Sequence, residues 1–337
     1  MYANLLKSWQ NMVYCELPTP EIGAGEALVR MRYAGVCGSD ITVYDGKHMT
    51  ATAPVVLGHE ILGSIEQISP DSDFKVGERV TAYPLISCGE CYACKAGNRH
   101  VCRELKLLGI HVNGGYEQYV KIPTDMLVRV PDRLPDKLAA LAEPFAVGAH
   151  STARARVTKG SRVFVIGAGP IGVIIALCAK QRGGEVYIAE INEKRAALAK
   201  SLGIDCLELG KNQLDECLRV TDGCGFDAVI EASGSKAGIL LTTDACKIGG
   251  IIVPMSLSGA PVEFVLGKVS FKEQTVVGSR VYTFAHFVEG VEMLDTIAHR
   301  QNIENLVSDI LPLSEARRAI DMMKRGENAA KILIDCE

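Results

Sequence analysis

The spacing of hydrophobic positions changes along this chain. From Met1 to about Glu143, short apolar segments are interrupted by glycine and proline; they include EALVRMRYAGV, ILGSIEQIS, GERVTAYPL and YEQYVKIP. Short segments of this kind are typical of β-strands. We therefore expect the first part of the chain to be rich in β-structure.

Between Pro144 and Arg280, short apolar strands alternate with helical segments. The strands are RVFVIG, EVYIAE, AVIEAS, GIIVPMS and TVVGS, and EKRAALAKSLG is one of the helical segments. This alternation predicts a doubly wound parallel α/β sheet. After Tyr282 come two helical patterns, FVEGVEMLDTIA and SEARRAIDMMKRG, and a final strand, AAKILIDC.

Length and charge favour a two-domain protein that acts on a small molecule. The chain has 337 residues and a net charge of −4, with no basic run that would suggest nucleic acid or a membrane surface as partner. It shows no signal-peptide pattern and no apolar run long enough to span a membrane. We therefore expect a cytoplasmic protein whose 12 cysteines are reduced.

The segment VFVIGAGPIGVIIALCAK carries a G-x-G-x-x-G motif between an apolar strand and an apolar helix. Gly167 permits a tight turn, Gly169 lets a pyrophosphate approach the backbone, and Gly172 lets the helix pack against the sheet. The phosphates would lie at the helix N-terminus, next to Pro170 and Ile171. A glycine-rich turn without a ligand is the alternative.

Glu190 ends the next predicted strand, EVYIAE. An acidic side chain at this position accepts hydrogen bonds from the adenosine ribose and repels a 2′-phosphate, which favours NAD over NADP. Lys194 and Arg195 follow closely, and Arg195 is a further candidate cofactor contact that could weaken this preference. A solvated helix surface is the alternative for both basic residues.

Four cysteines, Cys88, Cys91, Cys94 and Cys102, lie within SCGECYACKAGNRHVC. Thiolates this close repel one another unless a cation neutralises them, and Zn²⁺ binds four of them in a closed tetrahedron. Because such a site has no open position, we predict a structural zinc. Four unligated cysteines or an iron–sulfur cluster are the alternatives.

A second set of candidate ligands is spread over GVCGSD, LGHEILG and LAEPFAVGAH. Cys37, His59 and Glu143 are each unremarkable alone: a core cysteine, a satisfied histidine and a glutamate at a segment end. Together they offer a thiolate, an imidazole and a carboxylate. This mixed donor set is typical of an open, catalytic zinc site.

The motifs CGSD, GHE-x-x-G, the four-cysteine lobe, GGYEQY, EPFAVGAH and GAGPIG occur in this order. Their combination resembles the zinc-dependent medium-chain alcohol/polyol dehydrogenases over nearly the whole chain. The resemblance implies a GroES-like, β-rich catalytic domain at 1–146 and 282–337, with its structural-zinc lobe at about 87–103. It also implies an inserted Rossmann NAD-binding domain at 147–281, and a homodimer or homotetramer.

The EPF segment is similar to that of the sorbitol dehydrogenase branch. In that branch a glutamate replaces the third cysteine ligand of the alcohol dehydrogenases, which implies that Glu143 binds the catalytic zinc. Glu60 corresponds to a near-metal residue that can approach or retreat. Asp40 is expected to orient His59, with a turn or capping role as the alternative.

The resemblance implies NAD⁺-linked oxidation of a secondary alcohol, or the reverse reduction. Zinc would lower the pKa of the substrate hydroxyl, and the nicotinamide would take the hydride. Ser39 occupies the position of the hydroxyl that accepts the substrate proton. Many relatives continue with CGSD-x-H, whereas this chain has Thr42, so that Thr42 with water, or another group such as His48, would carry the proton outward.

Arg280, in TVVGSRVYTF, follows the last predicted strand of the parallel sheet. Strand ends in such sheets face the ligand crevice, and arginine binds carboxylate or phosphate bidentately. The chain also resembles bacterial dehydrogenases of galactonate, idonate and galactitol phosphate, which implies a polyhydroxylated substrate, either a sugar acid or a polyol. The alternative for Arg280 is an inter-domain or subunit-interface ion pair. The alternatives for the whole protein are a threonine-type dehydrogenase, a zinc-free reductase and a non-catalytic, zinc-held nucleotide-binding protein.

Overall fold

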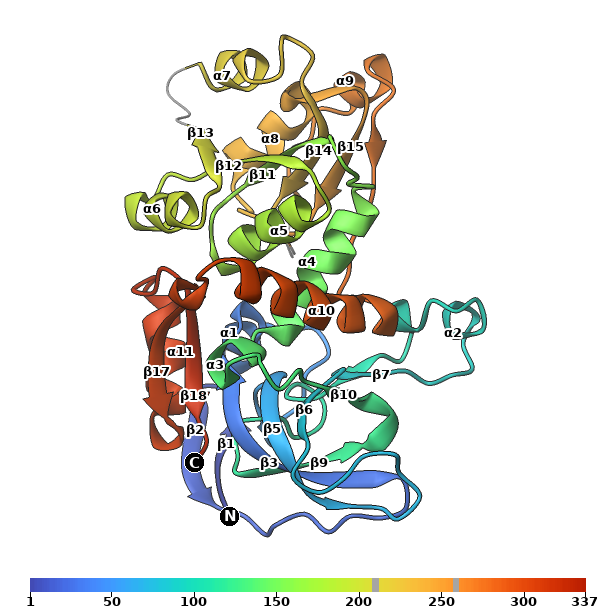
Figure 1. Cartoon of the computed structure of the whole chain (residues 1–337), viewed down its shortest axis with the longest axis vertical. Helices are drawn as coiled ribbons and strands as arrows, with labels where there is room; N and C mark the ends of the chain where they lie inside the picture. Colours follow the sequence, from blue (N-terminus) through green and yellow to red (C-terminus); the bar gives the residue numbers. More distant parts are fainter. Residues whose placement is uncertain (208–211, 257–260) are drawn as a thin grey trace. The chain divides into compact units, whose positions relative to one another are not determined.

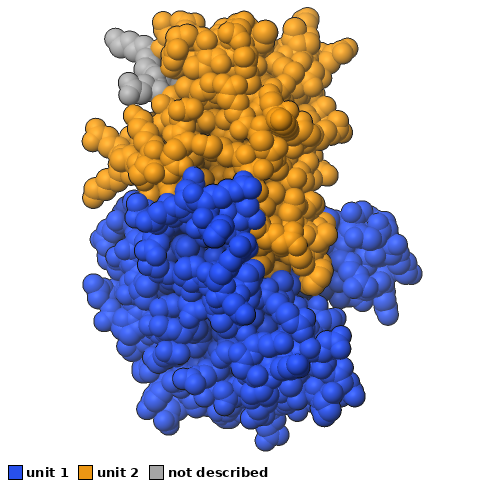
Figure 2. Space-filling view, viewed as in Figure 1, with its two compact units in different colours: residues 1–143, 294–337 blue, residues 144–293 orange. Residues whose placement is uncertain are grey.

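The computed structural model describes residues 1–207, 212–256 and 261–337 (Figure 1). The chain divides into two compact units, which Figure 2 colours separately. Unit 1 comprises Met1–Glu143 and Leu294–Glu337, and unit 2 comprises Pro144–Met293. Among the described residues, no helix is long and apolar enough to cross a membrane.

Unit 1 is built mainly of short strands, as the glycine- and proline-punctuated pattern predicts. Its strands are β1 (Tyr2–Ser8), β2 (Asn11–Glu16), β3 (Glu26–Gly35), β4 (Val55–Val56), β5 (Glu60–Ile68), β6 (Arg79–Ala82), β7 (Leu85–Ile86), β8 (Lys106–Leu107), β9 (Tyr119–Pro123), β10 (Leu127–Arg129), β17 (Val307–Pro312) and β18 (Lys331–Asp335). Its short helices are α1 (Gly38–Tyr44), α2 (Tyr92–Lys95), α3 (Asp136–Ala139) and α11 (Ala316–Lys324). Two longer helices, α4 (Ala142–Arg154) and α10 (Phe284–Arg300), contain the residues at which the chain passes between the units.

Strand β3 organises the largest sheet of unit 1. It pairs along its length with β5, while its opposite edge is shared by β9, next to Glu26–Arg30, and β18, next to Tyr33–Gly35. The buried side chains of β3, such as Val29 and Met31, lie in one hydrophobic core with Ile332 and Ile334 of β18. The C-terminal part of the chain therefore completes the sheet that the N-terminal part begins.

Unit 2 contains a six-stranded parallel sheet in the order β13-β12-β11-β14-β15-β16. Its strands are β11 (Arg162–Ile166), β12 (Glu185–Ala189), β13 (Asp205–Leu207), β14 (Phe226–Glu231), β15 (Cys246–Pro254) and β16 (Thr275–Val276). The helices between them are α5 (Pro170–Gln181), α6 (Glu193–Ser201), α7 (Gln213–Arg219), α8 (Lys236–Ala245) and α9 (Leu266–Phe271).

The strand order reverses between β11 and β14, the position at which doubly wound sheets bind their ligands. Phe164 of β11 and Phe226 of β14 stack at 4.8 Å between ring centroids and join the two halves of the core. A β-rich unit and a doubly wound parallel sheet are the fold class that the hydrophobic pattern predicts, and the prediction is confirmed.

Candidate active site and zinc centres

The four lobe cysteines lie around one point of unit 1. Their sulfur atoms are 3.4 Å apart for Cys88–Cys102, 3.5 Å for Cys91–Cys94, 3.9 Å for Cys91–Cys102 and 4.0 Å for Cys88–Cys94. Four sulfurs held about 2.3 Å from a tetrahedral zinc are about 3.8 Å from one another. The spacing in the lobe therefore fits a closed zinc site.

The backbone of the lobe favours thiolates. The backbone N–H groups of Arg103 and Cys94 lower the pKa of Cys91 to about 6. By contrast, burial raises the pKa of the Cys94 thiol to about 11. A cation at the centre of the four sulfurs is needed to keep all of them deprotonated at neutral pH, which also fits zinc.

A second cluster lies where the end of β3 pairs with the start of β5. Antiparallel pairing sets Gly35 of β3 opposite Glu60 of β5, so Cys37, two residues after β3, comes next to His59, one residue before β5. One ligand atom from each of Cys37, His59 and Glu60 lies within 4.8 Å of the others. Sulfur, nitrogen and oxygen donors together are the set that zinc uses in catalytic sites.

A buried lysine, which the sequence analysis did not identify, holds one side of this cluster. Lys331 Nζ donates hydrogen bonds to Glu60 Oε1 at 2.5 Å and to the Val36 carbonyl at 2.9 Å. Glu60 is fully buried, and its second oxygen, Oε2, has no hydrogen-bond partner within the described residues. A Cβ at Gly35 would lie 2.1 Å from that oxygen, so only glycine leaves it room.

Asp40 is placed to orient the histidine of the cluster. Its Oδ2 accepts hydrogen bonds from the Cys37 N–H and the Tyr116 hydroxyl, both at 2.9 Å, and its Oδ1 lies 3.6 Å from His59 Nδ1. His59 Nε2 lies 3.4 Å from the Ser39 hydroxyl oxygen. Tyr116 is part of the GGYEQY motif, but its contact with Asp40 was not predicted.

The charge around His59 also favours a cation. Burial acts to lower the pKa of His59, but the negative charges of Cys37, Asp40 and Glu143 outweigh it and hold the pKa well above its usual value. Glu143 is therefore close enough to act on the cluster, and it is 7% exposed in the first turn of α4. The cluster of ligand atoms found among the described residues includes Glu60 and not Glu143, so Glu143 as third ligand stays a prediction.

The structure connects the two hydroxyl groups of the predicted proton path through the backbone. The Thr42 hydroxyl donates to the Ser39 carbonyl at 2.8 Å, and Thr42 is exposed. In the part of the chain that the structure describes, the two side chains share no direct hydrogen bond. The proton-relay roles of Ser39 and Thr42 stay predictions.

In the glycine loop of unit 2, open space lies next to Gly169, whereas Gly167 and Gly172 are closely packed. Gly167 has φ +102°, and a Cβ at Gly172 would lie 1.9 Å from the Gly167 carbonyl oxygen. A Cβ at Gly169 would meet nothing within 4 Å. Pro170 begins α5, and Ile171 follows it. The loop thus leaves open space at the helix N-terminus, where pyrophosphates bind.

Glu190 ties this loop to the end of β12. Its Oε2 accepts a hydrogen bond from the Ala168 N–H at 2.9 Å, and its Oε1 accepts from the N–H groups of Ile191 and Asn192 at 2.8 and 2.9 Å. Arg195 is half-buried near the start of α6. Both residues are thus positioned at the carboxyl end of the sheet, and their contacts with a coenzyme stay predictions.

Glu231 is a further acidic residue at this edge, and the sequence analysis did not single it out. It is buried at the end of β14, and its Oε1 accepts from the N–H and hydroxyl of Ser233 at 2.9 and 2.6 Å. Its Oε2 accepts from the Ser256 hydroxyl at 2.8 Å. These bonds fix the loop against which Gly167 packs, since a Cβ at Gly167 would lie 3.0 Å from Ser233.

Arg280 lies beyond β16, the last strand of the parallel sheet, and its side chain is exposed. Within the described residues of unit 2, no carboxylate forms an ion pair with it. Both the anion-binding role of Arg280 and the inter-domain or subunit-interface ion pair stay predictions.

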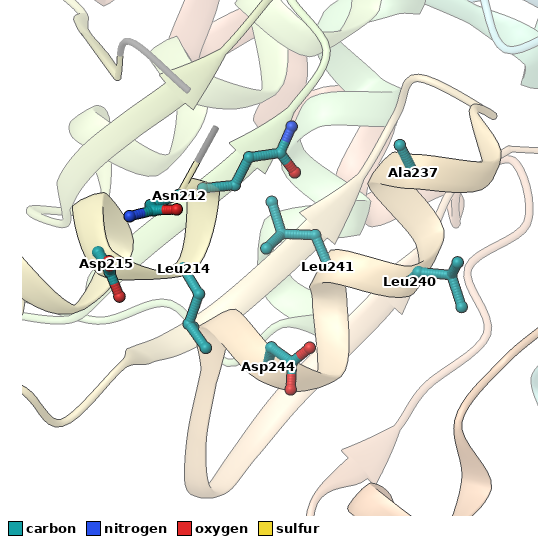
Figure 3. Close-up of a pocket in the computed structure, with 8 residues that line it drawn as sticks. Asn212, Leu214, Asp215, Ala237, Leu240, Leu241 and Asp244 are labelled. Carbon is teal, nitrogen blue, oxygen red and sulfur yellow. The ribbon is translucent and has the colours of Figure 1, made fainter. Parts of the chain in front are cut away.

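A surface pocket of about 460 Å³ lies between α7 and α8 (Figure 3). Asp215, Leu241 and Asp244 are among the residues that line it. Asp244 accepts hydrogen bonds from Lys268 at 2.6 and 2.8 Å. None of the predicted site residues lines this pocket, and we assign it no part in the chemistry.

Comparison with known protein families agrees with both units. The model of the alcohol dehydrogenase GroES-like domain matches residues 23–132, and the model of the zinc-binding dehydrogenases matches residues 170–296. Three relatives illustrate the range of activities. The sorbitol dehydrogenase of Halalkalibacterium halodurans is 34% identical over 95% of this chain and 94% of its own length. The L-galactonate-5-dehydrogenase of Escherichia coli is 34% identical over 81% of each chain. The L-threonine 3-dehydrogenase of Rhizobium rhizogenes is 32% identical over 95% of this chain and 93% of its own.

Solved structures show the same fold. L-idonate 5-dehydrogenase from Escherichia coli matches with a TM-score of 0.90 and 28% identity over 99% of this chain and 97% of that chain. An alcohol dehydrogenase from Escherichia coli CFT073, solved with NADH, has the same TM-score and identity, and the match covers 99% of both chains. The GroES-like and Rossmann assignments are confirmed. The chain belongs to the zinc-dependent medium-chain dehydrogenases, and it is a zinc-dependent, nicotinamide-linked alcohol dehydrogenase.

Proposed function

We propose that this dehydrogenase interconverts a secondary alcohol and a ketone on a polyhydroxylated substrate, either a sugar acid such as galactonate or idonate or a polyol. The observation that carries the proposal is the cluster of Cys37, His59 and Glu60, with the charge of Glu143 beside it. Relatives with this domain plan act on sorbitol and L-galactonate. Zinc held by these residues would supply Lewis acidity.

The residues around the cluster would each hold a ligand or move a proton. Cys37 and His59 are two ligands, and Glu143 is the third, with Glu60 in second place as a near-metal carboxylate. Asp40 holds His59 in orientation through the contact at Nδ1. Ser39 accepts the proton of the substrate hydroxyl, and Thr42 with water passes it outward.

The coenzyme is NAD in this proposal. The pyrophosphate would lie over Gly169, where the backbone is open. Glu190 keeps one lone pair, on Oε2, beyond its three bonds to backbone N–H groups, and it would accept a hydrogen bond from the ribose there. Arg195, near this carboxylate, is the candidate contact that would weaken the preference against NADP.

Arg280 is the candidate anion clamp for a sugar acid. It is exposed, and it pairs with no carboxylate in the described part of unit 2. Arginine can bind a carboxylate with two parallel hydrogen bonds, which lysine cannot do. Arg280→Lys would therefore raise the KM for galactonate and leave that for sorbitol unchanged, if the clamp exists.

The test is NAD⁺ reduction by the zinc-loaded protein with matched substrates: sorbitol, galactonate, idonate and L-threonine. Turnover of the aldonates alone supports the sugar-acid assignment, and turnover of sorbitol alone supports a polyol enzyme. Turnover of L-threonine alone would contradict the proposal and favour the threonine-type alternative. The similarity to the L-threonine 3-dehydrogenase of Rhizobium rhizogenes supports this alternative. Absence of turnover with every substrate would contradict the proposed substrate class.

Metal content tests for the catalytic zinc site without an activity assay. Two zinc ions per chain, one of them lost in Cys37→Ser, are expected for a catalytic and a structural site. A single zinc that Cys37→Ser leaves in place would contradict the catalytic site. We also propose a cytoplasmic homodimer or homotetramer, in which residues 1–146 and 282–337 form one catalytic domain and residues 147–281 form the coenzyme domain. Sedimentation equilibrium tests the oligomeric state.

A further inference from the structure

Two histidines and a threonine form a second polar group in unit 1. We call His48, Thr50 and His111 the imidazole cluster. Thr50 Oγ1 lies 3.0 Å from His111 Nε2, and the two imidazole rings meet edge to face with centroids 5.9 Å apart. His48 and Thr50 belong to the segment after α1, and His111 lies between β8 and β9.

Backbone contacts fix which nitrogen of each ring carries the proton. The Leu107 N–H donates to His111 Nδ1 at 3.1 Å, and the Ala51 N–H donates to His48 Nδ1 at 3.1 Å. In a neutral imidazole one nitrogen accepts and the other donates, so both rings carry their proton on Nε2. His111 then donates to Thr50 Oγ1, and the hydroxyl proton of Thr50 must point elsewhere.

The neutral form of His111 is the relevant one. Burial lowers the pKa of His111, and the nearby His48 and Lys106 lower it further. At neutral pH the ring therefore keeps the donor at Nε2 that holds the threonine oxygen. Thr50 is exposed, and its hydroxyl proton has no acceptor in the described part of the chain.

Both loops of the imidazole cluster are fastened to the segments that carry the zinc-site residues. The His48 N–H donates to the Thr42 carbonyl at 3.1 Å, and the Thr42 hydroxyl donates to the Ser39 carbonyl at 2.8 Å. On the other side, the Gly115 N–H donates to the carbonyl of Gly58, the residue before His59, at 2.7 Å.

The second loop also packs tightly on the same residue. A Cβ at Gly109 would lie 2.5 Å from the Gly58 carbonyl oxygen, and one at Gly114 would lie 2.0 Å from it. His111 lies between these two glycines in the sequence. Its backbone is thus held by the segment that ends in His59, with little freedom to shift.

We propose that the imidazole cluster is a substrate-recognition site, in which Thr50 Oγ1 donates a hydrogen bond to a hydroxyl or carboxylate oxygen of the substrate remote from the reacting carbon. Thr50 touches the substrate, while His111 and His48 are positioning residues that hold its hydroxyl and its backbone. This inference rests on the proposed function, because it requires a substrate with several oxygen atoms. Oriented neutral donors suit such a substrate better than an aliphatic alcohol.

The experiment compares kcat/KM for a polyhydroxylated substrate, sorbitol or galactonate, with kcat/KM for the simple secondary alcohol 2-butanol. Thr50→Val removes the hydroxyl and keeps the branched shape, and we expect the ratio of the two values to fall about tenfold. Most of this change is expected in KM, because a remote hydrogen bond forms equally in ground and transition states. Thr50→Ser should restore the ratio, and the control Thr52→Val, an exposed threonine of the same segment, should not change it.

The positioning role of His111 has its own readout. If His111 acts through Thr50, His111→Asn lowers the ratio, and adding it to Thr50→Val lowers the ratio no further. An unchanged ratio in Thr50→Val, with wild-type turnover of the polyhydroxylated substrate, overturns the recognition site alone. An equal loss of kcat/KM on both substrates in Thr50→Val overturns the recognition site as well, and it indicates that the imidazole cluster only stabilises the fold. A wild-type enzyme that oxidises no polyhydroxylated substrate overturns the proposed function and this inference together.

Discussion

Glu117 is a buried carboxyl group whose ionisation should weaken the fold. It is 1% exposed, its Oε2 has no hydrogen-bond partner among the described residues, and burial raises its pKa to about 8. We predict that Glu117→Gln, which keeps the shape but carries no charge, becomes progressively more stable relative to the wild type as pH rises.

The magnitude follows from the difference between the two pKa values. The ordinary value is 4.5 and the folded value about 8, a difference that corresponds to a ceiling of about 5 kcal/mol. An acid whose pKa is raised on folding binds more protons in the folded state than in the unfolded state. The free energy of unfolding is therefore highest below pH 4.5 and falls as pH rises from there to about 8. Between about pH 6 and pH 8, the wild type should lose about 2 kcal/mol relative to the variant.

The assay is urea denaturation of the zinc-saturated proteins at about pH 6, 7 and 8, with the free energy of unfolding of each variant compared with the wild type. Glu66→Gln is the matched control, because Glu66 is an exposed glutamate on β5. A constant offset between Glu117→Gln and the wild type is allowed, since the amide has hydrogen-bonding needs of its own. A difference that stays flat over this pH range, or that shrinks as pH rises, would refute the reasoning.

Three further predictions concern the two sites. Gly172→Ala should lower the melting temperature, because the new Cβ would lie 1.9 Å from a carbonyl oxygen. Gly169→Ala should leave the melting temperature unchanged, because its Cβ points into open space, but it should raise the KM for NAD⁺. Asp40→Asn should weaken zinc binding about 10- to 100-fold, measured by competition with a chelator, because it alters the partner of a ligating histidine. Lys331→Met should reduce the free energy of unfolding by about 3–5 kcal/mol, and the double variant Glu60→Gln/Lys331→Met should lose less, because no buried charge is then left alone.

Local patterns were enough to predict the coenzyme unit. The strand, the glycine loop and the following helix are contiguous in sequence, and one of the three glycines meets a constraint set by a near neighbour. Gly172 is limited by the carbonyl of Gly167, five residues earlier. The same holds for the cysteine lobe, where all four sulfurs belong to one short segment.

The inner structure of the catalytic cluster could not be predicted in this way. Lys331 contacts Glu60 only because β18 pairs with β3, and β3 with β5. In sequence, Lys331 looks like an ordinary charged residue at the start of an apolar strand. This contact engages one oxygen of Glu60, while the other oxygen has no hydrogen-bond partner within the described residues. The contact of Tyr116 with Asp40 could not be predicted either, because the two residues are 76 positions apart in the sequence.

The place of β18 in the largest sheet has a consequence for synthesis on the ribosome. Every strand of unit 2 is translated before Lys331–Asp335, so unit 2 can fold while unit 1 still lacks a strand. Until β18 docks, Tyr33–Gly35 remain an open edge and Glu60 is without its ammonium partner. The nascent chain can therefore complete the Glu60 side of its catalytic cluster only after every strand of the coenzyme unit has been translated.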